Sequence, residues 1–308
     1  MKDSLTKKAV RCFVIATALS VAMFLITACG GSGAVSDPGL SAVAPSTTAY
    51  RKDLKYGYYG SNDAQLSETV DHINIFMAAN WGGQIPESQL SQMIAAKNAG
   101  IPIIMDLPEA WQPIKGVFSY DPARAQLRVT DRFAELERAG VLHSIVAFYP
   151  RDEPDLPGSS VPAEQVIATN TMIRKVMADF KVTAKLAVIY APTWTWPGIE
   201  SYDWVGFDQY GVNIFTNGSF NKLKSVINKN GRVDQKIILV PGGADKWAED
   251  PIPFFNQATL DPDVIMIMAF IWLDNADPTN GAFAGIRSNK MNAAYKSVGM
   301  KISHPTRF

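Results

Sequence analysis

Short apolar runs alternate with longer amphipathic segments from about residue 52 to the C-terminus. The runs are rich in Val, Ile, Tyr and Phe and stop at polar or turn-forming residues, which is typical of buried strands. Eight such runs predict strands at Lys55–Gly60, Ile73–Ala78, Ile101–Asp106, Ser144–Tyr149, Lys185–Tyr190, Trp204–Asp208, Lys236–Val240 and Val264–Ile271.

The segments between the runs predict helices, because several have proline near the start and glycine just past the end. The predicted helices are Asp63–Val70, Pro86–Ala99, Pro122–Ala139, Pro162–Phe180, Phe220–Asn230, Pro253–Leu260 and Asn289–Val298. Eight strands alternating with helices predict an α/β fold, a single (β/α)8 TIM barrel over residues 52–308. An open doubly wound sheet is the alternative, because periodicity does not give strand order. The loop after the first predicted strand lacks the GxGxxG fingerprint of the dinucleotide-binding version of that sheet.

The N-terminus has a different pattern. Lys7, Lys8 and Arg11 precede the apolar run Cys12–Ile26, which is short for a transmembrane helix of about 20 residues. We predict a signal peptide over residues 1–28 and a flexible tether, rich in Gly, Ser, Ala and Pro, over residues 29–51.

The sequence Ile26-Thr27-Ala28-Cys29 resembles the bacterial lipobox. The resemblance implies a lipid on Cys29 and a lipid-anchored protein of the bacterial cell envelope, in the outer membrane if the cell is Gram-negative, with its domain outside the cytoplasm. A secretory signal without lipidation is the alternative. With Cys12 removed and Cys29 lipidated, neither of the 2 cysteines could form a disulfide.

Charge gives no sign of nucleic-acid binding. The chain has 29 basic and 29 acidic residues. Residues 1–28 include four basic residues and one acidic residue, so the rest of the chain has 25 basic and 28 acidic residues. A nucleic-acid surface would need a basic patch. No protein partner is evident from the sequence either.

Aromatic, acidic and amide side chains follow the predicted strands, and the C-terminal ends of barrel strands share one mouth. Flat aromatic rings beside planar polar groups suit sugars, which offer apolar faces and hydroxyls. The alternative is that each tryptophan only seals the barrel top. The substrate-binding candidates are Asn80, Trp81, Asp106, Trp111, Asp152, Trp194, Trp196, Tyr210, Asn213, Trp247 and Trp272.

The fourth predicted strand is followed by Arg151-Asp152-Glu153-Pro154, which resembles the Asn-Glu-Pro signature of the large (β/α)8 glycoside hydrolase superfamily. The resemblance implies that Glu153 is the general acid/base and that Trp272 floors a sugar site. Two features depart from it. Asp152 replaces an amide that donates hydrogen bonds, and the seventh strand ends in Val240-Pro-Gly-Gly-Ala-Asp245 without the nucleophilic Glu.

Glycoside hydrolysis needs a second carboxylate, and Asp208 at the end of the sixth strand is the best candidate. An acid and a tyrosine there resemble the chitinase-type barrels, although their Asp-x-x-Asp-x-Asp-x-Glu motif is absent. Asp106, Asp245 and Asp274 are the other candidates. Structural alternatives are an Asp208–Arg151 ion pair and a loop-capping role for Glu153. Repulsion between Asp152 and Glu153 is expected to raise one pKa, and Arg151 to oppose the rise.

Other chemistries are less well supported. All three histidines lie away from the predicted mouth, which disfavours a histidine metal site or a Ser-His-Asp triad. Pro241-Gly242-Gly243 could approach a phosphate, and the acidic segment from Asp274 could bind calcium, but turn roles explain both.

The sequence therefore predicts a glycosidase for oligo- or polysaccharides that needs no metal or cofactor. A non-catalytic carbohydrate-binding lipoprotein is the alternative, and a barrel serving only as an interaction scaffold is a third possibility.

Overall fold

The computed structural model describes residues 51, 53–59, 63–78, 86–111, 121–157, 160–230, 232–277 and 281–305. The predicted signal peptide, the predicted tether with Cys29, and the candidates Asn80 and Trp81 lie outside these ranges. In the described part of the chain, no helix is both long and apolar enough to cross a membrane.

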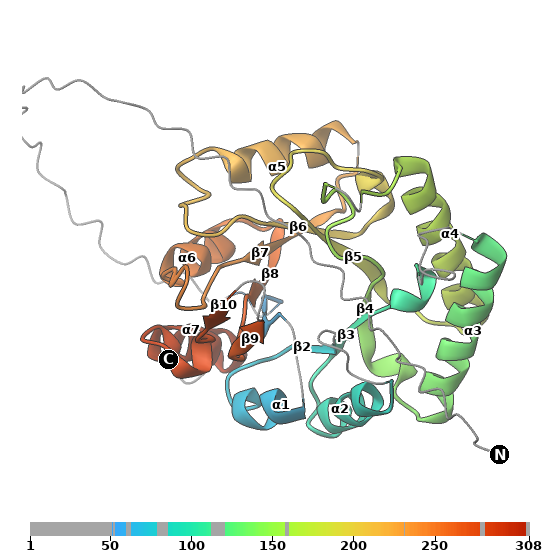
Figure 1. The fold of residues 1–308 in the computed structure, drawn as a ribbon, viewed down its shortest axis with the longest axis horizontal. Coiled ribbons are helices and arrows are strands. Elements are labelled where there is room, and N and C mark those ends of the chain that lie inside the picture. The colour runs from blue at the N-terminus through green and yellow to red at the C-terminus, as the bar shows by residue number, and fades with distance from the viewer. Residues whose placement is uncertain are drawn as a thin grey trace, which may run out of the picture. The chain divides into compact units, whose positions relative to one another are not determined.

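Eight parallel strands form a ring (Figure 1). They are β1 (Lys55–Tyr58), β2 (Phe76–Ala78), β3 (Ile103–Asp106), β4 (Ile145–Tyr149), β5 (Lys185–Tyr190), β6 (Trp204–Asp208), β7 (Lys236–Val240) and β8 (Val264–Ala269). Strand β1 pairs with β8, and the ladder runs in order down to β2. Next to β2, the Asn74 side chain accepts from the Tyr56 amide at 2.7 Å and donates to the Leu54 carbonyl at 2.9 Å, which links β1 to the segment before β2. The predicted barrel is confirmed, and the open sheet is wrong.

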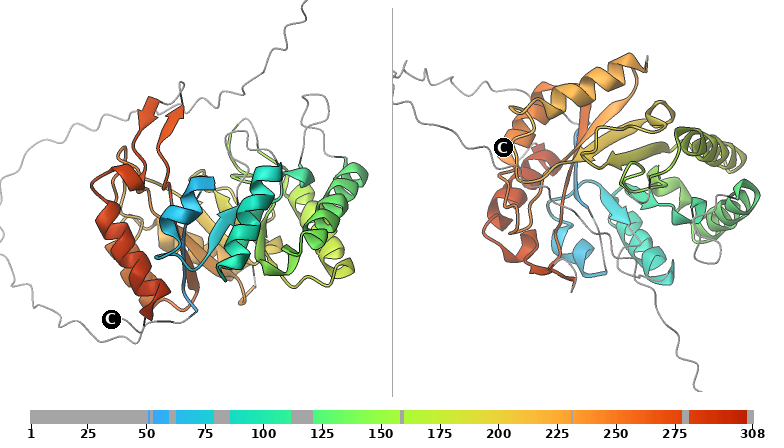
Figure 2. Two further views of the ribbon diagram at one scale, coloured as in Figure 1. Left: turned by 90° about the horizontal axis from the view of Figure 1, so that it is seen from below. Right: turned by 45° about the horizontal axis from the view of Figure 1, so that its top comes forward.

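Helices surround the ring on the outside, as the further views show (Figure 2). They are α1 (Asp63–Thr69), α2 (Pro86–Asn98), α3 (Pro122–Arg138), α4 (Ala163–Asp179), α5 (Ser219–Lys229), α6 (Ile252–Leu260) and α7 (Asn292–Ser303). A small two-stranded sheet of β9 (Asn275–Asp277) and β10 (Gly281–Phe283) was not predicted.

The last helix corrects a prediction. Gly299 was expected to end it, but α7 runs through Gly299 to Ser303. A Cβ at Gly299 would lie 2.3 Å from the His72 carbonyl oxygen. The glycine therefore allows close packing of α7 on the barrel, whereas a helix-ending glycine would follow the last turn.

Side chains of β6 alternate between two apolar layers, one inside the ring and one under the helices. Val205 and Phe207 belong to the outer layer. Gly206 faces inward, where a Cβ would lie 2.8 Å from the Ile238 carbonyl oxygen. Asp208 is two residues further along the same face, so the strand carries its carboxylate to the inside of the barrel mouth.

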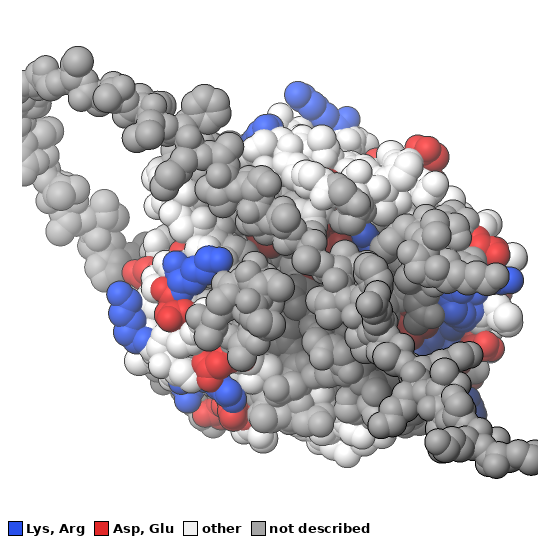
Figure 3. Space-filling view, viewed as in Figure 1, with Lys and Arg blue, Asp and Glu red and all other residues white. Residues whose placement is uncertain are grey.

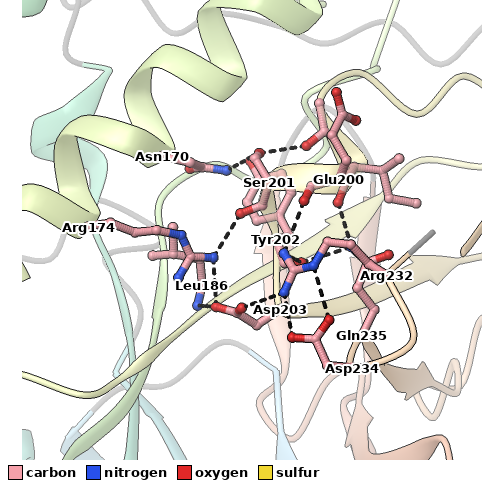
Figure 4. Close-up of polar contacts among 12 residues, drawn as sticks. Asn170, Arg174, Leu186, Glu200, Ser201, Tyr202, Asp203, Arg232, Asp234 and Gln235 are labelled. Atoms are coloured by element: carbon pink, nitrogen blue, oxygen red, sulfur yellow. Dashed lines mark hydrogen bonds and ion pairs between the residues drawn. The ribbon is translucent and has the colours of Figure 1, made fainter. Parts of the chain in front are cut away.

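Acids at the opposite end of the barrel are paired with cations (Figure 4). Asp203, just before β6, accepts from Arg174 at 2.9 Å, from Arg232 at 3.0 Å and from the Leu186 amide at 2.8 Å. Lys224 forms an ion pair with Asp261 at 2.7 Å in the same way. On the face seen in Figure 3, the described Lys and Arg side chains lie among Asp and Glu rather than in a patch of one sign. The carboxylates at the mouth have a different environment.

Candidate active site

Glu153 is held at the mouth by an unusual backbone conformation. It lies four residues past the end of β4 with φ at 41°, in the left-handed region that non-glycine residues rarely adopt. Its amide donates to the Ile189 carbonyl of β5 at 3.1 Å, and its carbonyl accepts from the Leu156 amide at 3.0 Å. Such strained positions cluster at functional sites. The backbone of Glu153 is therefore fixed by β5 and by its own turn.

Asp152 is held by two tyrosines. Its Oδ1 accepts from the hydroxyls of Tyr59, which follows β1, and Tyr149, which ends β4. Those two hydroxyls lie 2.9 Å apart. Burial raises the pKa of Asp152, while the tyrosine hydrogen bonds and the charge of Arg151 oppose the rise. The sequence did not single out either tyrosine, although an aromatic residue at each strand end was a usable signal.

Asp208 acts on Glu153 through its charge and a side-chain hydrogen bond. Asp208 Oδ2 accepts from the Tyr210 hydroxyl at 3.1 Å. Its Oδ1 is buried and receives no hydrogen bond from an amide, a hydroxyl or a cationic side chain of the residues that the structure describes. The carboxyl groups of Asp208 and Glu153 lie within hydrogen-bonding reach of each other. Two carboxylates both lack a donor, so this hydrogen bond requires a proton on one of them.

The proton resides on Glu153. Burial, followed by the charges of Asp208 and Asp152, raises the pKa of Glu153 to about 9. Burial and the charge of Asp152 raise the pKa of Asp208 to about 7, against the opposing hydrogen bonds from Tyr210 and Glu153. At neutral pH, Glu153 is thus a protonated acid that donates to Asp208, as in other carboxyl pairs that share a proton.

A cluster of three aromatic rings lies beside the pair. The Tyr210 ring stacks on Phe270 with centroids 5.3 Å apart, and it contacts Trp247 at 4.5 Å. A Cβ at Gly242 would lie 2.8 Å from Tyr210 Cδ1, so only glycine leaves room for this ring. Trp247 is half-buried. This aromatic cluster fixes the tyrosine that bonds Asp208.

No protein-family model and no curated protein match this chain. Solved structures do. A GH113 β-1,4-mannanase superposes with a TM-score of 0.53 at 10% identity, over 80% of this chain and 97% of that one. A fungal β-1,4-galactanase superposes with a TM-score of 0.53 at 12% identity, over 82% of this chain and 94% of that one. A β-galactosidase from the psychrophilic Marinomonas ef1 superposes with a TM-score of 0.57 at 11% identity, over 82% of this chain and 60% of that one.

The chain has the fold of the (β/α)8 glycoside hydrolases. At such low identity the likeness establishes the fold alone, so the chemistry has to be argued from the side chains of this chain.

The pairing of Glu153 with Asp208 bears on the role expected for Asp208. Two carboxyl groups that act on opposite faces of a sugar stand about 5–5.5 Å apart in retaining enzymes and about 6.5–9.5 Å apart in inverting ones. The charge of Asp208 and a hydrogen bond with it both raise the pKa of Glu153. We therefore propose that Asp208 shares the Glu153 proton, and its part as the second catalytic carboxylate stays a prediction. The partners of Asp208 are Tyr210 and Glu153, so the alternative of an ion pair between Asp208 and Arg151 is not supported.

The remaining strand-end acids are held by other groups. Asp106 accepts from Gln89, which also donates to the Ala78 carbonyl at 3.0 Å. Asp245 accepts from the Ala284 amide at 3.0 Å. Asp274 accepts from Arg287 at 2.9 Å and Ser288 at 2.8 Å, and these bonds lower its pKa against burial. The calcium alternative also needs Asn275, Asp277 and Asn280, whose side chains lie outside the described residues. In the described ranges, no group of three His, Cys, Asp or Glu side chains could hold a metal ion.

Glu249 was not a candidate, yet it organises the mouth. Its carboxylate accepts from the amides of Gly211, at 2.9 Å, and Gly242. The segment after β6 is thereby tied to the segment after β7. The Gly243 amide donates to the Phe270 carbonyl at 2.6 Å. Both glycine amides are thus engaged, which overturns the phosphate alternative.

The other tryptophans do not form one sugar platform. Trp111 and Trp272 are 8% and 2% exposed and belong to the outer apolar layer. The Trp272 indole donates to Glu68 at 2.6 Å, so the floor expected from the family resemblance is not supported. Trp194 and Trp196 are half-buried against Phe207, on the outer face of β6. For these four, sealing the barrel explains their positions better than stacking on a sugar.

Asn213 and the histidines complete the placement of the candidates. Asn213 is exposed, and its Oδ1 accepts from the amides of Phe215, at 3.0 Å, and Thr216, at 3.3 Å, which makes it a turn residue. His72 is buried before β2, beside Asp71 at 2.5 Å. His143 precedes β4, and His304 contacts the Asp71 carbonyl at 2.8 Å. The histidines are away from the mouth, as predicted.

The buried proton predicts a pH-dependent effect on stability. The unfolded Glu ionises near 4.5 and the folded one near 9, so the wild type loses stability as pH rises between these values. Glu153→Gln lacks this loss. Its free energy of unfolding should match that of the wild type near pH 4 and exceed it by about 1–3 kcal/mol near pH 9. Urea unfolding at several pH values measures the difference, with the exposed Glu200→Gln as control. A difference that stays constant with pH would contradict the buried proton.

Proposed function

We propose that this protein is a glycoside hydrolase that cleaves O-glycosidic bonds of an oligo- or polysaccharide, with Glu153 as the general acid. The observation that carries the proposal is the place of Glu153 after β4 of a (β/α)8 barrel, where burial and the charges of Asp208 and Asp152 raise its pKa to about 9. Bond cleavage needs a proton for the leaving oxygen at neutral pH, and a carboxyl with a raised pKa supplies it.

The proton can be followed through the reaction. Glu153 gives its proton to the glycosidic oxygen as the bond to the anomeric carbon breaks, and the leaving alcohol departs. Water adds to the anomeric carbon, and the proton that it releases restores the Glu153–Asp208 pair. Asp208, with a pKa of about 7, can accept a share of this proton. We assign Asp152, which its two tyrosines hold in place, to a hydrogen bond with a sugar hydroxyl beside the pair.

The test uses a panel of β-1,4-linked manno-, galacto- and gluco-oligosaccharides of two to six residues, together with nitrophenyl β-glycosides. The first two linkages are those named for the structurally similar mannanase and galactanase. We expect the full chain to release reducing sugar from at least one member of the panel. Calorimetric titration with the same panel measures binding independently of turnover.

A non-catalytic carbohydrate-binding protein is the second candidate. It is favoured by one observation: the seventh strand does not end in a Glu, and the strand-end acids Asp106 and Asp245 are held by Gln89 and the Ala284 amide. Binding of an oligosaccharide without release of reducing sugar would favour this candidate over the hydrolase.

Anchoring to a membrane through lipid on Cys29 is part of the same proposal, and it rests on Ile26-Thr27-Ala28-Cys29. Mass spectrometry of the mature N-terminus should find a diacylglycerol thioether on Cys29, and Cys29→Ala should appear in the soluble fraction. An unmodified mature N-terminus at another residue would contradict the anchor.

A further inference from the structure

A cavity adjoins the aromatic cluster. It has a volume of about 290 Å³ and lies between the segment after β6, the segment after β7 and the start of α6. This volume is at the lower end of small-molecule sites, which suits one sugar ring. The residues used below all line it: Val212, Asn213, Trp247, Asp250, Pro253 and Phe254.

The walls combine apolar surface with unused polar groups. Trp247 and Phe254 provide aromatic surface, and Trp247 is half-buried. Asn213 uses its Oδ1 for two backbone amides, so its amide N–H groups have no partner among the described residues. Asp250 Oδ1 accepts from the Ile252 amide at 2.9 Å, and among the described residues no donor bonds Oδ2. A donor, an acceptor and an aromatic wall match a pyranose ring.

The walls are also rigid. Glu249, at the back of the cavity, spends both carboxylate oxygens on the Gly211 and Gly242 amides. Its own amide donates to the Gly242 carbonyl at 3.0 Å, and its carbonyl accepts from the Tyr295 hydroxyl at 3.1 Å. A preformed site loses little conformational entropy on binding.

The cavity is adjacent to the acid pair. Trp247 lines it and contacts the Tyr210 ring at 4.5 Å, while the Tyr210 hydroxyl bonds Asp208 at 3.1 Å. Gly211, the next residue after Tyr210, lines the cavity as well. A sugar chain that places one bond at Glu153 therefore has a neighbouring ring position at Trp247.

We infer that this cavity is a subsite for a sugar ring beyond the bond that is cleaved. The substrate is then a chain of several sugars and not a single terminal sugar on a small aglycone. The inference rests on the proposed function. It assigns Trp247, Asn213 and Asp250 to binding, and it assigns no role in proton transfer to any of them.

The experiment compares the full chain with two variants of the cavity. The Val212 side chain lines the cavity and is 41% exposed. Val212→Phe should therefore fill the cavity without disturbing the core. Asp250→Asn keeps the Ile252 contact and replaces the second acceptor by a donor. Val233→Phe is the matched control, because Val233 is 95% exposed and does not line the cavity. Near-ultraviolet circular dichroism checks that each variant is folded.

The readout is the ratio of kcat/KM for the longest oligosaccharide of the panel to that for the nitrophenyl glycoside. We expect this ratio to fall about tenfold or more in Val212→Phe, to fall in Asp250→Asn, and to stay unchanged in Val233→Phe. If the wild type cleaves the substrates and Val212→Phe leaves the kcat/KM ratio unchanged, the subsite is overturned and the proposed hydrolase is not.

If the wild type cleaves nothing, calorimetry decides. Binding that strengthens with oligosaccharide length and weakens about tenfold in Val212→Phe would support the subsite and reject the hydrolase. Absence of any binding would overturn both.

Discussion

Glu153→Gln should lower kcat for hydrolysis of unactivated oligosaccharides by about 10²–10⁴-fold, because a positioned general acid contributes that much. The amide keeps the shape of the side chain and can still donate to Asp208, but it has no proton to give to the leaving oxygen. KM should change little. Reducing-sugar release by wild type and variant on the same substrate measures the loss.

The leaving group provides a sharper readout than the loss itself. The phenolate of a glycoside with an acidic phenol leaves without being protonated. Glu153→Gln should therefore lose much less activity on a dinitrophenyl glycoside than on an oligosaccharide. A structural role for Glu153 would lower both activities alike, and equal losses would contradict the acid. Glu200→Gln, at an exposed position in the segment between β5 and β6, is the matched acid-to-amide control.

Asp208→Asn should move the alkaline limb of the pH–rate profile to lower pH by about one unit or more. In the wild type, activity requires protonated Glu153 and falls above its pKa of about 9. Removing the Asp208 charge removes a repulsion that holds this pKa up. The Tyr210 hydroxyl can donate to the new amide oxygen, which turns the amide nitrogen toward Glu153, where it stabilises the ionised form. Both changes lower the pKa of Glu153.

The profile of kcat/KM between pH 5 and 10 measures this shift, because kcat/KM reports the ionisations of the free enzyme. Asp245→Asn is the control, since Asp245 follows β7 and accepts from the Ala284 amide. An alkaline limb at the same pH in wild type and Asp208→Asn would show that Asp208 does not act on the Glu153 proton.

The sequence predicted the strands well because each barrel strand is a continuous apolar run with a definite end. Val205 and Phe207 face the helices while Asp208 faces the mouth, and that alternation follows from strand geometry alone. The end of α7 could not be predicted in the same way. The role of Gly299 depends on the close approach of the His72 backbone, which lies far away in sequence.

The site was only partly predictable for the same reason. Glu153 and Asp208 follow strands, so their place at the mouth could be inferred, but their direct contact depends on the turn that puts Glu153 at positive φ. Trp272 also follows a strand, yet its side chain turns outward to Glu68. Glu249 lies well past β7, and only the path of its loop brings it to two glycine amides.

The most direct test of the account is the titration of Glu153 itself. Carboxyl ¹³C chemical shifts of glutamate-labelled wild type, assigned by comparison with Glu153→Gln, follow its ionisation between pH 4 and 10. The account predicts one glutamate that stays protonated at pH 7 and ionises near 9, and that is missing from the variant. A Glu153 signal that titrates near the ordinary value of 4.5 would contradict it, because Glu153 would then be ionised at neutral pH and could not protonate a leaving group.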